Sequence, residues 1–209
     1  MNHIITARKV FDIELAALVA VRGQQDESFN QAVDLVVVNT LNHGKVIITG
    51  VGKSGDIGRK ISATLTSTGT LSLFLSPADA LHGDLGMVGD LDVILALSYS
   101  GESEELIRLL SALSEFLVPV IAITGNRQSA LAQRSDVVLK ASVPREACPF
   151  NLTPTASSTA MLALGDALAM AVLVARGLRV QDFARFHPSG AIGRALKKNP
   201  PLGFPDGGF

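Results

Sequence analysis

The chain has 209 residues with 18 basic and 19 acidic side chains, so its formal net charge at pH 7 is −1. This balance excludes the broad basic surface with which proteins bind nucleic acids or anionic membranes. The single cysteine, Cys148, excludes an internal disulfide framework and suits a reducing, cytoplasmic environment.

Two helical patterns open the chain, at 4–21 and 29–41, and Gly23 separates them. We expect residues 1–43 to form a helical arm that packs on the same domain and makes oligomer contacts. From residue 44 onward, short apolar runs alternate with helical segments. The apolar runs predict strands at 46–49, 71–75, 92–97, 119–124 and 137–140. The helical segments lie at 56–68, 102–116, 129–134, 155–176 and 180–184.

Five short buried strands separated by helices indicate a parallel sheet with helices on both faces. The predicted fold is therefore α/β, a three-layer αβα sandwich of the flavodoxin or Rossmann type that occupies residues 44–196. Residues 197–209 are rich in proline and glycine, and we expect them to form a flexible tail.

The first predicted strand runs into a glycine-rich turn, Gly50–Gly55, with the G-x-G-x-x-G spacing of dinucleotide-binding loops. The acidic residue that would bind a ribose is missing, because the second strand ends at Leu75 and Asp79 lies beyond its end. A P-loop would need a glycine where Ile47 stands. Both nucleotide interpretations, including an NAD-dependent oxidoreductase, therefore lack a residue that their pattern requires. What remains is a tight turn that presents N–H groups, a hydroxyl and the Lys53 ammonium at a helix start.

The third predicted strand runs into Ser98–Glu105, where three serines and a glycine precede a helical pattern. Backbone N–H groups at a helix N-terminus have no intrahelical acceptor and attract anions. The alternative is structural: Ser100 or Ser103 caps the helix, and the glutamates favour its dipole. In a sheet of order 2-1-3-4-5, this stretch and Gly50–Gly55 would face one crevice. Such a crevice suits a phosphate monoester better than a dinucleotide.

These two loops resemble those of the sugar isomerase (SIS) domain. Four further segments resemble the arabinose 5-phosphate isomerase family, without its C-terminal pair of CBS modules: ALHGDLG at 80–86, REACP at 145–149, LTPT at 152–155 and FHP at 186–188. The similarity extends from about Gly44 to Arg194, and Ser189 stands where the family usually has a second glycine.

The resemblance implies a reversible aldose–ketose isomerisation between D-arabinose 5-phosphate and D-ribulose 5-phosphate through a cis-enediolate. The product would feed lipopolysaccharide biosynthesis, and no cofactor would be required. Two alternatives remain: a phosphosugar-binding SIS protein without catalysis, and an isomerase of another phosphosugar.

Catalytic roles carried over from the family fall on Lys53, Glu105, Glu146, His187 and His82. The predicted substrate-binding residues are Gly52, Ser54, Ser98, Tyr99, Ser100 and Ser103. We expect a histidine–glutamate combination to transfer the protons, since the unperturbed pKa of a histidine is near neutral and burial can raise the pKa of a carboxyl group into that range. Sequence alone does not separate Glu102, Glu104 and Glu105.

Two histidines carry further expectations. His82 could hold an inhibitory zinc ion, which the family resemblance suggests. His187 lies far along the chain from the loops of the crevice, and in SIS proteins such a residue can enter the site of a neighbouring subunit. The sequence therefore predicts a homotetramer with sites shared between subunits.

Overall fold

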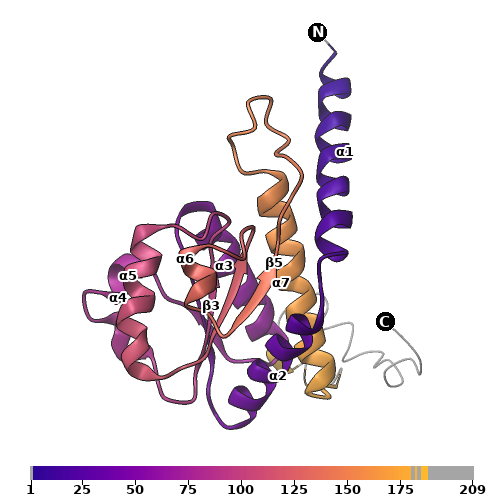
Figure 1. Cartoon of the computed structure of the whole chain (residues 1–209). Coiled ribbons are helices and arrows are strands. Elements are labelled where there is room, and N and C mark those ends of the chain that lie inside the picture. The colour runs from indigo at the N-terminus through magenta and orange to yellow at the C-terminus, as the bar shows by residue number, and fades with distance from the viewer. Residues whose placement is uncertain (1, 180–181, 183–184, 188–209) are drawn as a thin grey trace.

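The computed structural model describes residues 2–179, 182 and 185–187. A five-stranded parallel sheet lies between two layers of helices (Figure 1). Its strands are β1 Val46–Gly50, β2 Ser72–Phe74, β3 Val93–Leu97, β4 Val120–Thr124 and β5 Val137–Lys140. Their spatial order is β2-β1-β3-β4-β5, so both the predicted fold class and the predicted strand order are confirmed.

The helices are α1 His3–Arg22, α2 Glu27–Leu41, α3 Gly52–Ser67, α4 Pro77–Ala80, α5 Glu104–Leu113, α6 Ala130–Gln133 and α7 Ala156–Ala175, with short 3-10 helices η1 Asp84–Met87 and η2 Ser114–Phe116. Helix α3 begins four residues before the predicted start, because Gly52 adopts a φ of +55° and turns the chain directly from strand into helix. After α5, the chain forms the 3-10 helix η2, whose C-cap residue Leu117 has a left-handed backbone conformation. The helix predicted at 180–184 and the tail at 197–209 lie outside the described residues, except for residue 182.

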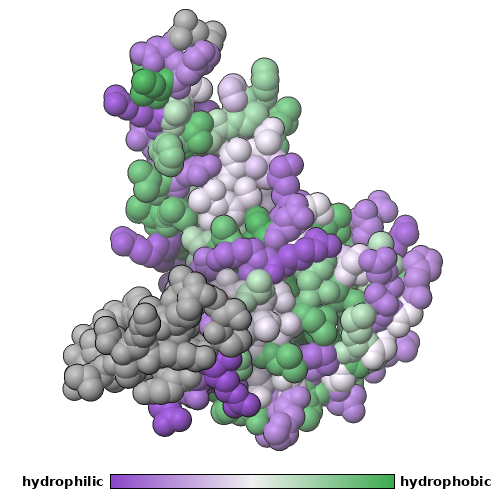
Figure 2. All heavy atoms as spheres, turned by 180° about the vertical axis from the view of Figure 1, so that it is seen from behind, coloured by the Kyte–Doolittle hydropathy of each residue, from purple (hydrophilic) through white to green (hydrophobic). Residues whose placement is uncertain are grey.

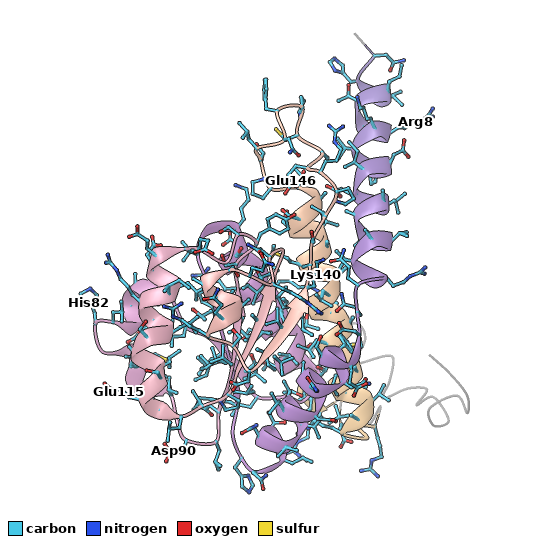
Figure 3. All side chains as sticks on the ribbon, viewed as in Figure 1. Arg8, His82, Asp90, Glu115, Lys140 and Glu146 are labelled. Atoms are coloured by element: carbon cyan, nitrogen blue, oxygen red, sulfur yellow. The ribbon has the colours of Figure 1, made fainter. Side chains whose placement is uncertain are left out.

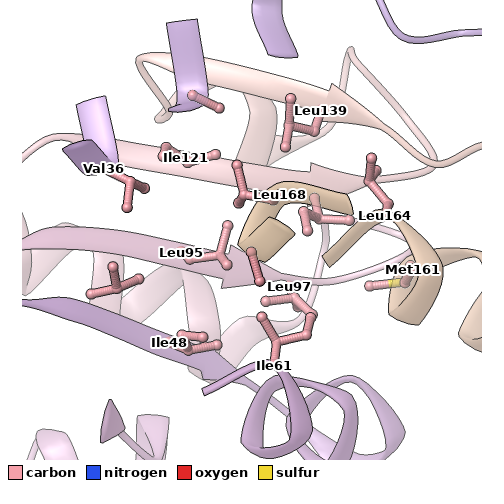
Figure 4. Packing of buried hydrophobic residues seen from close by; sticks show 14 of the residues in the cluster. Val36, Ile48, Ile61, Leu95, Leu97, Ile121, Leu139, Met161, Leu164 and Leu168 are labelled. Atoms are coloured by element: carbon pink, nitrogen blue, oxygen red, sulfur yellow. The ribbon is translucent and has the colours of Figure 1, made fainter. Parts of the chain in front are cut away.

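Side chains alternate between the two faces of the sheet and fill two separate cores. On β1, Val46 and Ile48 join the core under α1, α2, α3 and α7, whereas Ile47 joins the core under α4, α5 and α6. Figure 4 shows the first of these cores, in which Ile48 and Leu95 from the sheet meet helix side chains. Each fully buried aliphatic side chain contributes on the order of 1.5–3 kcal/mol. The strands are therefore fixed by packing on both faces, and this packing also fixes the points from which the loops at the strand ends start.

Helix α7 is strongly apolar and lies in the helical layer. Within the described part of the chain it is the single helix long and apolar enough to cross a membrane by length and composition. It packs against α1, α2 and α3, and its Asp166 forms an ion pair with Lys60 on α3. These contacts explain its composition as that of a core helix.

Helix α1 extends beyond the sheet, beside the N-terminal half of α7 and the loop between β5 and α7 (Figure 1). Four large apolar side chains at helical spacing on α1, Ile4, Phe11, Leu15 and Val19, are 59–66% exposed. We call this set the α1 stripe, and Figure 2 shows apolar surface along that helix. A contiguous exposed apolar surface of this kind marks a site of contact with another protein chain.

Candidate active site

The site lies between β1 and β3, where the direction in which successive strands are added to the sheet reverses. The two strands pair in parallel, with Gly50 opposite Leu97, so the turns that follow them start side by side. The next helices then diverge, since α3 packs on one face of the sheet and α5 on the other. This divergence opens a crevice at the carboxyl ends of the strands, as the predicted topology requires.

Both helices that border the crevice begin without a side-chain cap. Val51 stands at the N-cap of α3 and Ser103 at the N-cap of α5, and neither side chain makes a capping hydrogen bond. The Ser100 hydroxyl accepts from the N–H of Glu102 at 3.3 Å, which precedes α5. The structural alternative, a serine cap on α5, is therefore not what the geometry shows. The N–H groups of both first turns and the two helix dipoles are available to an anion.

The loop from β3 to α5 is tightly folded around two serines. The hydroxyl of Ser98 lies 3.1 Å from the hydroxyl of Ser103 and accepts from the N–H of Gly101, also at 3.1 Å. Gly101 has a φ of +72°, and a Cβ there would lie 2.1 Å from the Ser129 Oγ. Ser98 is buried, whereas Ser100 is exposed at the mouth of the loop. Ser98 thus holds the loop closed, and the more accessible hydroxyls remain for a ligand.

A cavity of about 210 Å³ opens beside the start of α3. Its walls come from three segments of the chain: Val51, Lys53, Ser54, Ile57, Tyr99, Pro154, Ser157, Ser158 and Met161. The structure thereby brings together Lys53, Ser54 and Tyr99 from the predicted site. The volume is below the roughly 300–1,000 Å³ of pockets for drug-sized ligands, so the cavity suits a small ligand.

Tyr99 forms a wall of this cavity and also ties two loops together. Its hydroxyl accepts from the N–H of Val143 at 3.2 Å, in the loop that follows β5. Its ring packs on Gly125, where a Cβ would lie 2.7 Å from the ring. Tyr99 was predicted to bind substrate, and the structure places it in the wall of this cavity.

The three glutamates at the start of α5 differ in their partners. Glu102 accepts from the N–H of Ala130 at 2.9 Å, and Glu104 lies 3.6 Å from Arg108. Glu105 forms no hydrogen bond or ion pair with any residue that the structure describes. All three side chains are exposed. The partners of the other two favour Glu105 as the carboxylate that can meet a ligand.

Glu146 lies at the top of α7, in the loop between β5 and that helix (Figure 3). The residue is 9% exposed, and its carboxylate accepts from the N–H groups of Thr155 and Ser157 at 2.8 and 3.2 Å. Burial raises the pKa of this carboxyl, but the hydrogen bonds from Ser157 and Thr155 outweigh burial and lower it overall. The group is therefore held as a carboxylate.

The two predicted catalytic histidines lie away from the Lys53 cavity. His187 lines a separate cavity of about 770 Å³, together with Arg59 and Asp84. His82 is exposed on the turn before η1, at the edge of the molecule in Figure 3. Among the residues that the structure describes, no three His, Cys, Asp or Glu side chains gather to hold a metal ion. A zinc site at His82 would therefore need ligands from elsewhere.

Sequence reasoning missed Ser157 and Ser158, which line the Lys53 cavity from the first turn of α7. The available signal was the hydroxyl-rich start of a long helix after the last strand, the same pattern that drew notice at Ser98–Glu105.

A crevice at the switch point of a parallel sheet is typical of α/β proteins that bind small ligands, and the hydroxyls, the lysine and the two uncapped helix starts here are groups that can bind an anion. The chain belongs to the SIS domain family, whose model matches residues 41–171.

Known proteins of this family resemble the chain over most of its length. It is 47% identical over 195 residues to arabinose 5-phosphate isomerase KdsD of Francisella tularensis. The aligned residues cover 93% of this chain and 60% of the relative. It is 49% identical over 190 residues to KdsD of Salmonella typhimurium, covering 90% of this chain and 57% of the relative. The chain thus spans about three fifths of the length of these curated relatives.

Solved structures match the whole fold. A protein of Escherichia coli CFT073 in complex with arabinose 5-phosphate is 36% identical, with a TM-score of 0.85 over 90% of this chain and 100% of that one. A protein of Bacteroides fragilis, described as involved in capsule formation, is 32% identical, with a TM-score of 0.86 over 89% of this chain and 97% of the other.

Proposed function

We propose that this chain is an aldose–ketose isomerase that interconverts D-arabinose 5-phosphate and D-ribulose 5-phosphate. The observation that carries the proposal is the pair of uncapped helix starts, α3 and α5, side by side at the ends of β1 and β3. Their N–H groups and nearby hydroxyls suit a phosphate monoester. The relatives supply the sugar, because one was solved with arabinose 5-phosphate and others are named arabinose 5-phosphate isomerase.

In this proposal the phosphate is a remote handle. It binds at the start of α5, where Ser100 and Ser103 add hydroxyls to the N–H groups of the first turn. Its binding energy positions the reacting carbons, which carry no phosphate themselves. Lys53 then supplies positive charge close to the enediolate that forms during the reaction.

The reaction moves two protons without any change of oxidation state in the enzyme. From aldose to ketose, the proton on C2 moves to C1, and a hydroxyl proton moves from O2 to O1. We assign these transfers to Glu105 and His187, a carboxylate and an imidazole, which are side chains that act as general acids and bases in enzymes. Since no electrons leave the sugar, the reaction requires no redox cofactor.

The proposed site is shared between subunits of a homotetramer. In the described part of one chain, His187 lines the 770 Å³ cavity and not the 210 Å³ cavity of Lys53. A second copy can bring its own His187 to the Lys53 cavity. The α1 stripe supports this assembly, because four large apolar side chains on one helix are exposed in the single chain.

The remaining parts of the proposal concern the cell. The near-neutral charge and the single cysteine support a cytoplasmic location. The product would feed the 3-deoxy-octulosonate sugar of lipopolysaccharide. Zinc at His82, with ligands from a neighbouring subunit, would inhibit, so a chelator should raise the rate of an inhibited preparation.

The test is to incubate the protein with D-arabinose 5-phosphate alone and to measure D-ribulose 5-phosphate. Turnover without any cofactor supports the proposal, and a panel of pentose, hexose and heptose phosphates ranks the substrates. Tight binding of arabinose 5-phosphate with no turnover of any phosphosugar would instead indicate a sensor. Glu105→Gln and His187→Ala should both lose turnover while binding of arabinose 5-phosphate persists, and near wild-type rates would contradict their roles.

A further inference from the structure

The Glu146 carboxylate occupies the N-terminus of α7 in the way that a bound anion would. One oxygen, Oε2, accepts from the N–H of Thr155 at 2.8 Å, from the N–H of Ser157 at 3.2 Å and from the Thr155 hydroxyl at 3.1 Å. Thr155 itself is the N-cap of α7 and makes no side-chain cap of its own. Glu146 thus provides the cap that α3 and α5 lack, and a negative charge there is stabilised by the helix dipole.

Thr155 closes this arrangement into a ring of hydrogen bonds. While its hydroxyl donates to Glu146, the same oxygen accepts from the N–H of Ala147 at 2.8 Å. On the other side, the N–H of Glu146 donates to the side-chain oxygen of Asn151 at 2.7 Å. We call the pair Glu146 and Thr155 the clasp. It joins the chain after β5 to the first turn of α7 across the eight residues 147–154.

The clasp holds one wall of the Lys53 cavity. Ser157 donates its N–H to Glu146, and Ser157 and Ser158 line the cavity together with Lys53 and Ser54. Glu146 itself is not among the residues that line it. All three hydrogen bonds go to Oε2 and stabilise the charged form of the carboxylate, which makes it a weaker acceptor for a proton from a sugar. Its lowered pKa points the same way, since a general base near neutral pH needs a raised one.

We propose that Glu146 and Thr155 are positioning residues of the isomerase, which fix the first turn of α7 against the cavity without transferring protons to or from the sugar. This proposal rests on the proposed function, and it replaces the proton-transfer role expected for Glu146 from the sequence.

The experiment compares kcat and KM across pH for four variants of the full chain. In Glu146→Gln the amide oxygen still accepts the N–H bonds, so we expect kcat within about tenfold of wild type and both limbs of the pH profile retained. Glu146→Ala removes the acceptor and should lower kcat by about 100-fold or more. We expect Thr155→Val to lower kcat about as much as Glu146→Ala does. Thr155→Ser keeps the hydroxyl, so its kcat should stay close to that of the wild type.

Two results would overturn the proposal. One is that Glu146→Gln is as inactive as Glu146→Ala, or loses a limb of the pH profile, while Thr155→Val stays near wild type. Such an outcome would make Glu146 a catalytic acid or base. The other comes from amide hydrogen exchange, which does not depend on turnover. Unchanged exchange at residues 155–158 in Glu146→Ala and Thr155→Val would refute the clasp, even if the wild type converts no arabinose 5-phosphate and the proposed function fails.

Discussion

The hydroxyl of Ser98 lies 3.1 Å from that of Ser103, so the end of β3 and the start of α5 meet through two serine side chains. Ser98 also accepts from the N–H of Gly101, which leaves it fully engaged within the loop. Ser103 is less buried and stands at the N-cap of a helix that no side chain caps. The two serines therefore have different parts in the proposed phosphate site: one shapes the loop, and the other can contact the anion.

We expect Ser103→Ala to raise the KM for arabinose 5-phosphate by about tenfold with a smaller effect on kcat, because a hydroxyl bond to a charged group is worth about 1.5–3 kcal/mol. Steady-state kinetics measure both constants. Ser111→Ala, which removes an exposed hydroxyl later in the same helix, is the matched control and should leave KM unchanged. An unchanged KM in Ser103→Ala would place the phosphate elsewhere.

Gly101→Ala should destabilise the protein by about 2–4 kcal/mol. The residue has a φ of +72°, which an alanine adopts with strain, and the new Cβ would lie 2.1 Å from the Ser129 Oγ. Urea denaturation measures the free energy of unfolding. Gly86→Ala serves as the control, since no atom lies within 4 Å of its added Cβ, and it should change stability by less than about 0.5 kcal/mol. Equal midpoints for the two variants would contradict this geometry.

The sheet was predictable because its strands are short apolar runs between helical patterns. The predicted strand at 137–140 coincides with β5, and the predicted order follows from the rule for doubly wound sheets. Helix α4 and the 3-10 helix η1 were not predicted, since four residues carry too little periodicity to reveal a helix.

The candidate site was predictable only where topology alone places residues. Gly50–Gly55 and Ser98–Glu105 follow neighbouring strands, so the strand order is enough to bring them together. The burial of Glu146 depends instead on Thr155, nine residues further along, and on how the loop between them folds back. No local pattern in the sequence reports such a contact, whereas Ser157 and Ser158 did stand in a visible pattern, the hydroxyl-rich start of a long helix.

Asp92→Asn should destabilise the protein by about 3 kcal/mol, because it removes one partner of a buried ion pair. Asp92 is 2% exposed, and its carboxylate accepts from the N–H of Lys45, the Lys45 ammonium and the N–H of Gly89 at 2.7–2.9 Å. The NH2 group of an asparagine at this position would face one of these N–H donors, so at least one hydrogen bond would be lost. Urea denaturation again measures the change, and Asp90→Asn, at a position outside this ion pair, is the control. A loss below about 1 kcal/mol would show that the pair is better solvated than its burial indicates.

Phe11→Glu should break the proposed oligomer. Phe11 is 66% exposed in the single chain, and a carboxylate at the centre of the α1 stripe would have to be desolvated in an interface. Sedimentation velocity should show a smaller species than the wild type, and isomerase activity should fall with it if sites are shared. The control is Leu91→Glu, which introduces the same charge at a residue that is 51% exposed. Leu91 follows Asp90, which lies away from α1 in Figure 3, so this variant should change neither the sedimentation nor the activity. A fully active monomer of Phe11→Glu would refute the shared site.

The thiol of Cys148 should be unusually reactive below neutral pH. Hydrogen bonds from the N–H groups of Thr153 and Leu152, and from the Thr153 hydroxyl, lower its pKa to about 6 from an ordinary value of about 8.5. Because these bonds stabilise the thiolate, the alkylation rate should rise as the pH rises through about 6 and level off from about pH 7 upward.

Cys148 is the single cysteine of the chain, so the iodoacetamide reaction, followed by mass spectrometry, reports this thiol alone. Thr153→Val removes the hydroxyl but keeps the N–H groups. The midpoint of the alkylation rate against pH should therefore move upward, part of the way from about 6 to about 8.5. A wild-type midpoint near 8.5 would mean that the loop between β5 and α7 does not hold its N–H groups around the sulfur. The order of that loop, on which the clasp depends, would then be in question as well.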